Sequence, residues 1–452
     1  MVATIIAIFI IGYLTIVLEH PLKLDKTVPA LLMGSICWAL LAIGFHNGLL
    51  TVVDGHDHLF SMADGFTEES EEGFVGALLH HLGKTAEILV FLIGAMTIVE
   101  IIDLHAGFQI LKSWVNTRSK KKLLWIIGAL AFILSAIIDN LTATIVLVTL
   151  LRKIIPDRTE RLWFAGMVVI AANAGGAWSP IGDVTTTMLW IGKKVSTLGL
   201  IEWLVIPSIV CFVVPTFIAT LLKPFKGEIH IEKSDEGPDR NLLSSKTMLF
   251  LGLGAIVFVP IFKTVTHLPP YLGMMLSLGF VWLISEYIHP EEEFEEERKH
   301  LYSAHLALSR IEMSSILFFL GILMAVAALE TMVVGGVGSL RYVAEGLENA
   351  IPNQDIVIML LGVGSAIIDN VPLVAASMGM YTEPIDAKLW HFIAYAAGTG
   401  GSMLIIGSAA GVAAMGMEKI DFIWYLKKIA WLAALGFVAG AVVFLIMFSF
   451  LG

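Results

Sequence analysis

The sequence predicts an all-α polytopic membrane protein made of two inverted-topology repeats. Of its 452 residues, 57% are hydrophobic and 15% are charged, and the mean hydropathy is +0.85. The apolar residues form many separate runs, which is typical of a chain that crosses a membrane repeatedly. The string Ser-Ala-Ile-Ile-Asp-Asn at 135–140 recurs unchanged at 365–370, in the middle of a second apolar run. This recurrence indicates an internal duplication.

Ten apolar runs are read as membrane spans, because about 20 helical residues cross about 30 Å of hydrocarbon. The runs lie near residues 2–18, 28–45, 86–105, 162–192, 200–222, 247–262, 271–289, 312–335, 389–417 and 429–450. The first run has no basic stretch before it and no small-residue cleavage site after it. We therefore expect a retained span rather than a signal peptide.

The two runs that carry the repeated string, 123–151 and 355–381, are predicted to be re-entrant helical hairpins. Basic residues flank the first run at both ends: Lys120, Lys121, Lys122, Arg152, Lys153, Arg158 and Arg161. Because Lys and Arg mark the cytoplasmic side, this run begins and ends on that side. Acidic residues flank the second run: Glu345, Glu348, Asp355, Glu383 and Asp386. The second hairpin is therefore predicted to enter from the outside.

These features divide the chain into two repeats and a linker. Residues 1–225 form the first repeat, 226–245 a polar cytoplasmic linker, and 246–452 the second repeat. Each repeat contains five spans and one hairpin, so the odd number of spans inverts the second repeat relative to the first. On this topology both termini are external.

A helix with an internal break follows each hairpin, within 162–192 and within 389–417. The first break, at 173–187, contains a Gly pair, a Pro and several side chains with oxygen atoms, and the second contains Gly398–Ser402 and Gly407-Ser408. Gly and Pro permit unwinding and free backbone carbonyls. Broken helices of this kind form substrate and ion sites near the membrane midplane of secondary transporters. The sequence therefore predicts a transport site.

Three carboxylates, Asp139, Asp183 and Asp369, fall in the predicted site. An ionisable group inside hydrocarbon is costly and is read as functional by default. Neither hairpin nor break contains Lys, Arg or His, which favours a hard cation held by oxygen ligands. Burial also disfavours the charged form of a carboxylate, so protons and a small cation can compete for the same oxygens. Competition together with alternating access is sufficient for cation/proton exchange.

Structural roles stay open for the same residues. Asp and Asn are preferred N-caps, so Asp139 and Asp369 could cap the hairpin arms, and Asp183 could cap a helix that starts at Val184. The hydroxyls of Thr185 and Thr186 could satisfy local backbone groups. Asp103 and Glu330, near the ends of their spans, are expected at an aqueous rim.

Other functional classes are disfavoured. The chain has no nucleotide-binding motif, which argues against ATP-driven transport. The two Asp motifs lie on oppositely inserted hairpins, which argues against an intramembrane protease, so we do not expect an enzyme. Cys37 and Cys211 are isolated, and neither a disulfide framework, a zinc site nor a cofactor is expected. The net charge of −11 argues against a nucleic-acid partner.

Two polar segments are predicted to be solvated loops. The segment 46–84 is expected on the external side, and its histidines at 56, 58, 80 and 81 do not have the spacing of a metal site. The acidic run Glu291–Glu297 is expected to have no binding role.

The strings resemble those of the ion transporter superfamily, and within it the NhaD-type sodium/proton antiporters. The resemblance rests on Ser-Ala-Ile-Ile-Asp-Asn at 135 and 365, on the stretch 173–186, and on Gly-Thr-Gly-Gly-Ser at 398–402. Relatives that carry dicarboxylates have Ser-Asn-Thr at the hairpin tips. Here the tips read Asp-Asn-Leu-Thr from 139 and Asp-Asn-Val-Pro from 369, which favours a cation as the sole substrate.

The resemblance implies exchange of Na⁺ or Li⁺ for H⁺ across a prokaryotic inner membrane, often by a homodimer. The residues that it implies for ion binding and proton coupling are Asp139, Asn140, Thr142, Asn173, Asp183, Thr185, Thr186, Asp369, Asn370, Thr399 and Ser402. In this hypothesis Asp139 and Asp369 host cation and proton in turn, and Asp183 completes the coordination. The alternative is a sodium-coupled importer of dicarboxylate or sulfate, or an arsenite-type permease, on the same scaffold.

Overall fold

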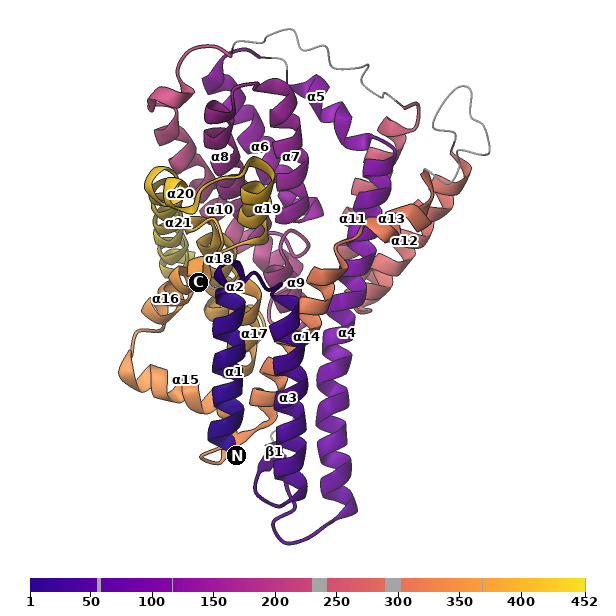
Figure 1. Cartoon of the computed structure of the whole chain (residues 1–452), viewed down its shortest axis with the longest axis vertical. Helices are drawn as coiled ribbons and strands as arrows, with labels where there is room; N and C mark the ends of the chain where they lie inside the picture. Colours follow the sequence, from indigo (N-terminus) through magenta and orange to yellow (C-terminus); the bar gives the residue numbers. More distant parts are fainter. Residues whose placement is uncertain (55–57, 116, 230–241, 289–301, 368, 452) are drawn as a thin grey trace. The chain divides into compact units, whose positions relative to one another are not determined.

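The computed structural model describes residues 1–451 except 55–57, 116, 230–241, 289–301 and 368. The described chain is mostly helical (Figure 1). It forms two compact units: unit 1 comprises Met1–Val90, Glu312–Ile358 and Val371–Pro384, and unit 2 comprises Phe91–Ile311, Met359–Asn370 and Ile385–Gly452. Each unit contains parts of both predicted repeats, so the units and the repeats are different divisions of the chain.

Unit 1 is built on the close pair of helices α3 and α14. Its elements are α1 (Val2–Val17), α2 (Glu19–Leu22), α3 (Thr27–His46), β1 (Thr51–Val53), β2 (Leu59–Ser61), α14 (Met313–Thr331), β3 (Val333–Val334), β4 (Val337–Gly338) and α15 (Ser339–Ala350). The strands form two antiparallel pairs, β1 with β2 and β3 with β4. A Cβ on Gly34 would lie 2.7 Å from the carbonyl oxygen of Gly321. Glycines at the crossing therefore let the two backbones approach closely.

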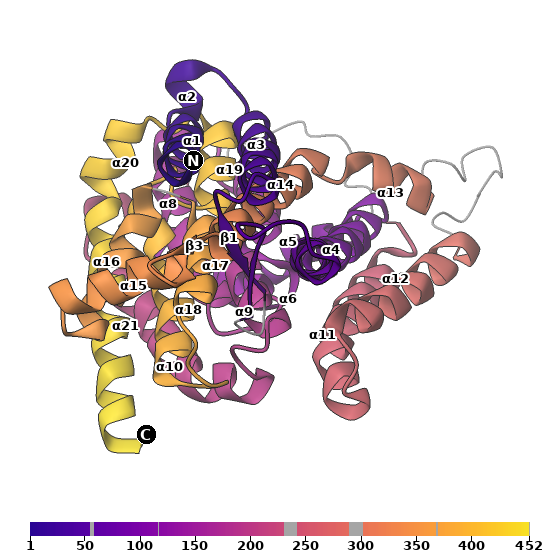
Figure 2. The same cartoon turned by 90° about the horizontal axis from the view of Figure 1, so that it is seen from below.

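Unit 2 contains both predicted broken helices. Its elements are η1 (Gly107–Gln109), α5 (Ile110–Trp114), α6 (Lys120–Ile138), α7 (Asn140–Ile154), α8 (Arg158–Gly176), α9 (Val184–Ile191), α10 (Thr197–Ala219), η2 (Lys223–Phe225), α11 (Ser245–Thr266), α12 (Pro270–Tyr287), α13 (Ala304–Arg310), α18 (Lys388–Gly400), η4 (Gly401–Met403), α19 (Ala409–Glu418), α20 (Phe422–Lys428) and α21 (Ala430–Leu451). The helices α6 and α7 pack on each other and on α8, and α11 packs beside α12 (Figures 1 and 2). Three helices cross the unit boundaries along the chain: α4 (Glu68–Leu104), α16 (Gln354–Ile367) and α17 (Asn370–Met380).

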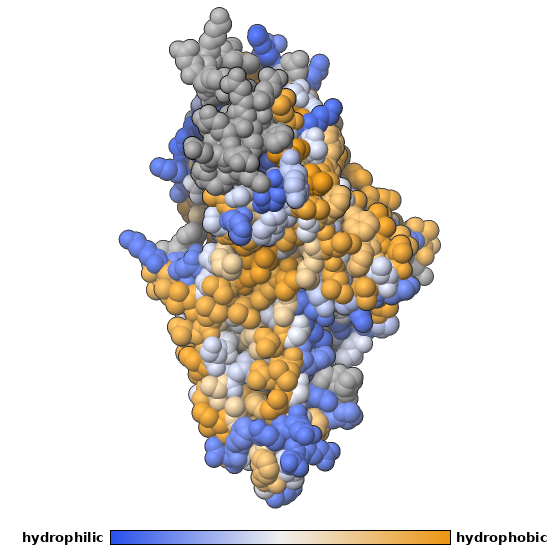
Figure 3. Space-filling view, turned by 90° about the vertical axis from the view of Figure 1, so that its right-hand side faces the viewer, coloured by the Kyte–Doolittle hydropathy of each residue, from blue (hydrophilic) through white to orange (hydrophobic). Residues whose placement is uncertain are grey.

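The helices have the length and surface of membrane spans. Within the described residues, seven helices are long and apolar enough to cross a bilayer: α3, α4, α6, α10, α11, α14 and α21. Large apolar side chains are exposed along the outer faces, for example Leu276, Phe280 and Leu283 on α12. In the face shown in Figure 3, apolar residues cover broad areas of the surface. The protein is an integral membrane protein.

Most predicted spans contain a helix with similar bounds, but the span predicted at 86–105 was too short. It is the second part of α4, a 37-residue helix that begins at Glu68. The prediction of a solvated loop over 46–84 is therefore wrong for residues 68–84, and β1 and β2 precede them. Acidic residues in the first turn, Glu68, Glu69 and Glu71, stabilise a helix N-terminus, although they lower the hydropathy. The loop predicted at Glu291–Glu297, residues 56–57 of the other predicted loop, and the central part of the 226–245 linker lie outside the described residues.

The helices are interrupted at the positions where the sequence predicts breaks. In the first repeat α8 ends at Gly176 and α9 begins at Val184, and in the second α18 ends at Gly400 and α19 begins at Ala409. The run 123–151 is interrupted at Asp139, between α6 and α7. The first arm, α6, is 19 residues long and longer than the short arm expected. Re-entry of both hairpins and the inversion of the repeats remain predictions.

Equivalent residues of the two repeats make equivalent contacts in unit 2. The hydroxyl of Ser135 donates to the carbonyl of Ala172 at 2.5 Å, and the hydroxyl of Ser365 donates to the carbonyl of Ala397 at 2.9 Å. Both contacts join the repeated string to the helix that precedes a break. The two copies of the repeated string therefore contact the helix before each break in the same way.

Candidate functional site

The two breaks place a capping side chain at the start of each following helix. Asp183 is the N-cap of α9, and its Oδ1 accepts a hydrogen bond from the backbone N–H of Thr185 at 3.1 Å. Ser408 is the N-cap of α19, and its Oγ accepts from the N–H of Gly411 at 3.1 Å. The N-cap role that the sequence left open for Asp183 is confirmed.

Glycines let the chain turn tightly at the first break. A Cβ on Gly176 would lie 2.6 Å from the carbonyl oxygen of Gly182, and a Cβ on Gly182 would lie 2.7 Å from the carbonyl oxygen of Ser135. Any larger residue would push the two sides of the break apart. The Gly residues thus hold Asp183 next to the repeated string of the first hairpin.

Asp183 is the centre of a buried polar cluster in unit 2. The residue is only 3% exposed. Its Oδ2 accepts from Nδ2 of Asn140 at 3.2 Å and from Nδ2 of Asn370 at 3.3 Å. These two Asn residues end the two copies of the repeated string, so both copies contribute to one carboxylate oxygen.

Asn173 connects the two broken helices. It is fully buried, and its Oδ1 accepts from Nδ2 of Asn140 at 3.0 Å. Its Nδ2 donates to Oγ of Ser408 at 2.9 Å. We call Asn140, Asn173, Asp183, Asn370 and Ser408 the Asp183 cluster. All five residues belong to unit 2.

The charge of the Asp183 cluster is not balanced by a basic side chain. In the described part of the chain, the hydrogen-bond partners of Asp183 are Thr185, Asn140 and Asn370, none of which is basic. Asp369 and Asp139 are close enough to Asp183 for charge repulsion. A buried carboxylate without a cationic partner is costly, and a proton or a metal cation would offset this cost.

Asp139 is the N-cap of α7. Its Oδ1 accepts from the N–H of Thr142 at 2.8 Å, and its Oδ2 accepts from the Thr142 hydroxyl at 2.9 Å. The backbone of Asp139 has φ 78° and ψ 158°, a region that costs about 1–3 kcal/mol for a residue with a side chain and is concentrated at functional sites. Asp369 is partly buried and precedes Asn370 in the same unit. Their proposed role as alternating hosts remains a prediction.

Most of the predicted hydroxyl ligands are used by the backbone. Thr186 donates to the carbonyl of Asp183 at 2.9 Å, Thr399 to the carbonyl of Tyr395 at 2.6 Å, and Ser402 to the carbonyl of Thr399 at 2.6 Å. Thr185 differs. Its hydroxyl is buried near the Asp183 carboxylate, but it is not in hydrogen-bonding geometry to any described group.

Two other sets of predicted residues lie outside the Asp183 cluster. Asp103 is exposed on α4, and Glu330 is half-buried in unit 1. His58 pairs with Asp54 through Nδ1 at 3.1 Å. Across the described residues, no group of three or more His, Cys, Asp and Glu side chains could hold a metal ion.

Ser408 is the residue of the cluster that sequence reasoning did not include. Its signal was its place in the second break: Gly407-Ser408 stands where the first break has Gly182-Asp183. Both residues are N-caps, of α19 and α9. Equivalence between the repeats would have identified Ser408.

The chain is similar over nearly its whole length to known transporters. The sequence model of the citrate transporter family matches residues 13–393. Sodium/proton antiporter 1 of Arabidopsis thaliana is 44% identical over 97% of this chain and 71% of its own length, and sodium/proton antiporter 2 of that plant is 43% identical over 98% and 99%. The Na⁺/H⁺ antiporter NhaD of Vibrio cholerae is 31% identical over 97% of this chain and 90% of that protein.

The fold is that of a solved transporter. The crystal structure of the YdaH transporter of Alcanivorax borkumensis, described as having an unusual topology, matches with a TM-score of 0.58 over 94% of this chain and 98% of that one. The sequence identity is 12%, so this similarity concerns the fold alone. The antiporters named above have a higher sequence identity to this chain. Their names agree with the family resemblance that the repeated strings indicate. The chain belongs to the citrate transporter family and, within it, to the NhaD-type sodium/proton antiporters.

Proposed function

We propose that this protein is a secondary active transporter that exchanges Na⁺ or Li⁺ for H⁺ by alternating access, with Asp183 as the principal host of both ions. The observation that carries the proposal is the buried Asp183 carboxylate, whose described partners are neutral amides and a backbone N–H. Carboxylate and amide oxygens are ligands that suit a hard cation. The names of the sequence relatives support the same function.

The exchange follows from competition for one carboxylate. Deprotonated Asp183 offers its oxygens to the cation, and the buried hydroxyl of Thr185 beside it is a candidate for a further ligand. Asn140 and Asn370 now donate their amide N–H groups to Oδ2. Half a turn of either amide would present its oxygen instead. Protonation of Asp183 removes the charge that holds the cation, so a proton and a cation leave and enter in turn.

An anion importer is less supported, because the cluster already holds a carboxylate and has no basic partner among the described residues. Anion sites generally use Arg, Lys or helix N-termini. The N-termini of α9 and α19 are capped by Asp183 and Ser408, and each cap occupies one N–H group of its helix. The family's description as citrate transporters nevertheless makes citrate the right competitor to test.

The experiment is ion-driven proton movement in proteoliposomes loaded with a pH-sensitive dye. We expect Na⁺ or Li⁺ alone to collapse an imposed proton gradient, and citrate to have no effect of its own and to be unnecessary. Asp183→Asn should abolish the response. Asp157→Asn is the matched control, since Asp157 is an exposed N-cap that accepts from the N–H of Thr159 at 2.9 Å. A response that requires citrate, or that survives in Asp183→Asn, would rule out the proposal.

We also propose a location, an orientation and an oligomeric state for the protein. We place the protein in a prokaryotic inner membrane with both termini outside, as a homodimer that needs no cofactor; similar antiporters occur in a plant and in bacteria. Labelling of single cysteines introduced at the two ends with an impermeant reagent in intact cells tests the orientation. Mass determination in detergent or nanodiscs tests the dimer.

A further inference from the structure

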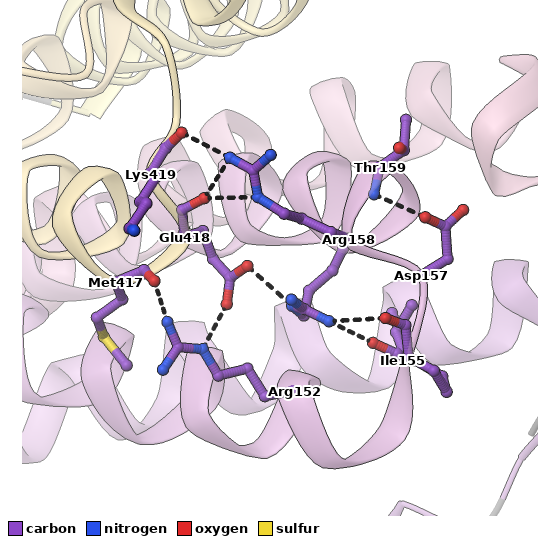
Figure 4. A network of polar contacts seen from close by, with 10 residues as sticks. Arg152, Ile155, Asp157, Arg158, Thr159, Met417, Glu418 and Lys419 are labelled. Atoms are coloured by element: carbon purple, nitrogen blue, oxygen red, sulfur yellow. Dashed lines mark hydrogen bonds and ion pairs between the residues drawn. The ribbon is translucent and has the colours of Figure 1, made fainter. Parts of the chain in front are cut away.

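Glu418, the last residue of α19, is a buried carboxylate held between two arginines (Figure 4). Its side chain is 1% exposed. Its Oε1 accepts from Nε of Arg152 at 2.7 Å, and its Oε2 accepts from Nε of Arg161 at 2.8 Å. Each carboxylate oxygen is therefore paired with an arginine, one at the end of α7 and one on α8.

The backbone at the same end of α19 is held as well. Arg158 donates to the carbonyls of Glu418 at 3.0 Å and Lys419 at 2.8 Å, and Arg152 donates to the carbonyl of Met417. The last carbonyls of a helix have no partner within the helix, and cations are favourable beside them. We call Arg152, Arg158, Arg161 and Glu418 the C-terminal clamp of α19.

The opposite end of α19 is part of the Asp183 cluster. The helix has 10 residues and is therefore about 15 Å long. Ser408, at its start, accepts from the N–H of Gly411 and from Nδ2 of Asn173. The clamp and the cluster are thus the two ends of one short helix.

The position of Ser408 determines how the Asn173 amide is turned. Because Ser408 accepts the Nδ2 hydrogen bond at 2.9 Å, the Oδ1 of Asn173 faces Asn140, which donates to it at 3.0 Å. If α19 slides along or rotates about its axis, Asn173 loses the acceptor that sets this orientation. Buried charge pairs are best attested as devices that fix the register of packed helices.

We propose that Glu418 is a positioning residue for the ion site: through the C-terminal clamp it fixes the register of α19, and through Ser408 and Asn173 it sets the affinity for the transported cation. The inference rests on the proposed function for its ion, but the register of α19 can be measured without transport. A clamp that only stabilises the fold is the competing explanation.

The first test is the Na⁺ dependence of exchange by Glu418→Gln in proteoliposomes. Loss of one neutral hydrogen bond in the cluster corresponds to an increase of about three- to tenfold in the half-saturating Na⁺ concentration. The maximal rate per reconstituted molecule should stay within about twofold of wild type, because Glu418 does not touch the ion. An unchanged half-saturating concentration, or a fall in the maximal rate alone, would overturn the proposal.

Two controls make this result specific. Glu160→Gln removes a carboxylate from α8 that pairs with Lys120 rather than with α19, and it should leave the Na⁺ dependence unchanged. In a Ser408→Ala background, Glu418→Gln should have no further effect, since the route through Ser408 is already lost. Additive effects of the two substitutions would count against that route. If Glu418→Gln fails to fold, the double variant E418Q/R161Q, which removes the charges of Glu418 and Arg161 together, is measured in its place.

The second test is hydrogen exchange of the purified protein, followed by mass spectrometry. Glu418→Gln should speed exchange in peptides that contain Gly411, whose N–H bonds to Ser408 at the far end of the helix. Faster exchange confined to residues next to 418 would show a local anchor and overturn the proposal. The hydrogen-exchange result does not depend on which ion the protein transports. An error in the role given to the clamp can therefore be distinguished from an error in the proposed function.

Discussion

Asn370 donates its side-chain amide to Oδ2 of Asp183 at 3.3 Å, across 187 positions of the chain. Asn140, its counterpart in the other copy of the repeated string, donates to the same oxygen at 3.2 Å. One carboxylate oxygen thus receives a hydrogen bond from each repeat. This convergence is the structural basis of the ion site that we propose.

The first prediction concerns these two amides. Asn370→Ala should weaken Na⁺ binding, because a hydrogen bond to a charged group contributes about 1.5–3 kcal/mol. Asn140→Ala should have the larger effect, since Asn140 also donates to Asn173. The half-saturating Na⁺ concentration in proteoliposomes measures both. Wild-type values in both variants would show that the amides do not support the site.

The second prediction separates two neighbouring threonines. Thr185→Val should raise the half-saturating Na⁺ concentration, because the buried Thr185 hydroxyl lies beside the Asp183 carboxylate, where it can serve as a further oxygen ligand. Thr186→Val should mainly lower stability, by about 1 kcal/mol, since the Thr186 hydroxyl bonds to the carbonyl of Asp183. The half-saturating Na⁺ concentration and the thermal unfolding temperature are measured for both variants and compared with wild type. Reversed effects would assign the ligand role to Thr186.

The third prediction concerns the glycine at the first break. Gly176→Ala should destabilise the protein by about 1–3 kcal/mol, because the new Cβ would lie 2.6 Å from the carbonyl oxygen of Gly182. Gly254→Ala on α11 is the matched control, since nothing lies within 4 Å of the position of its Cβ, and it should be neutral or stabilising by up to about 1 kcal/mol. Thermal unfolding in detergent measures both. Equal stability of the two variants would show that the break tolerates a side chain.

The fourth prediction is a pH dependence of the Na⁺ affinity. Protons and Na⁺ compete for Asp183, so the half-saturating Na⁺ concentration should rise as the pH falls. Where the carboxylate is largely protonated, the rise approaches about tenfold per pH unit. Exchange rates measured over a matrix of Na⁺ concentration and pH test this. A half-saturating concentration that is independent of pH would mean that the two ions bind at separate groups.

The sequence predicted the local features of the site because residue types determine them directly. The Gly pair at 175–176 and Pro180 predicted the first break, and the change from α8 to α9 occurs there. Asp139 interrupts its apolar run and caps α7. Each copy of the repeated string contributes one Asn to the Asp183 cluster. Turn and capping preferences act over a few residues, so one sequence is sufficient to detect them.

Features that depend on distant contacts could not be predicted in the same way. From the sequence, Asp139 and Asp369 were the expected hosts of cation and proton, and Asp183 was expected only to complete the coordination. The packing of the two breaks shows that Asp183 receives both amides. No local pattern marks Glu418 as buried, because an acidic residue at the end of a span is usually solvated. Its burial depends on Arg152 and Arg161, more than 250 residues earlier in the chain.

The most direct test of the account is proton release on Na⁺ binding by purified protein in weakly buffered detergent solution, followed with a pH-sensitive dye. We predict that addition of Na⁺ releases protons from the wild-type protein and from Asp157→Asn, whereas K⁺ at the same ionic strength does not reproduce the full release. Asp183→Asn should release none, because it has no proton to exchange at the cluster. Undiminished release from Asp183→Asn, or Na⁺ binding without any release from the wild type, would contradict the claim that one carboxylate hosts both ions.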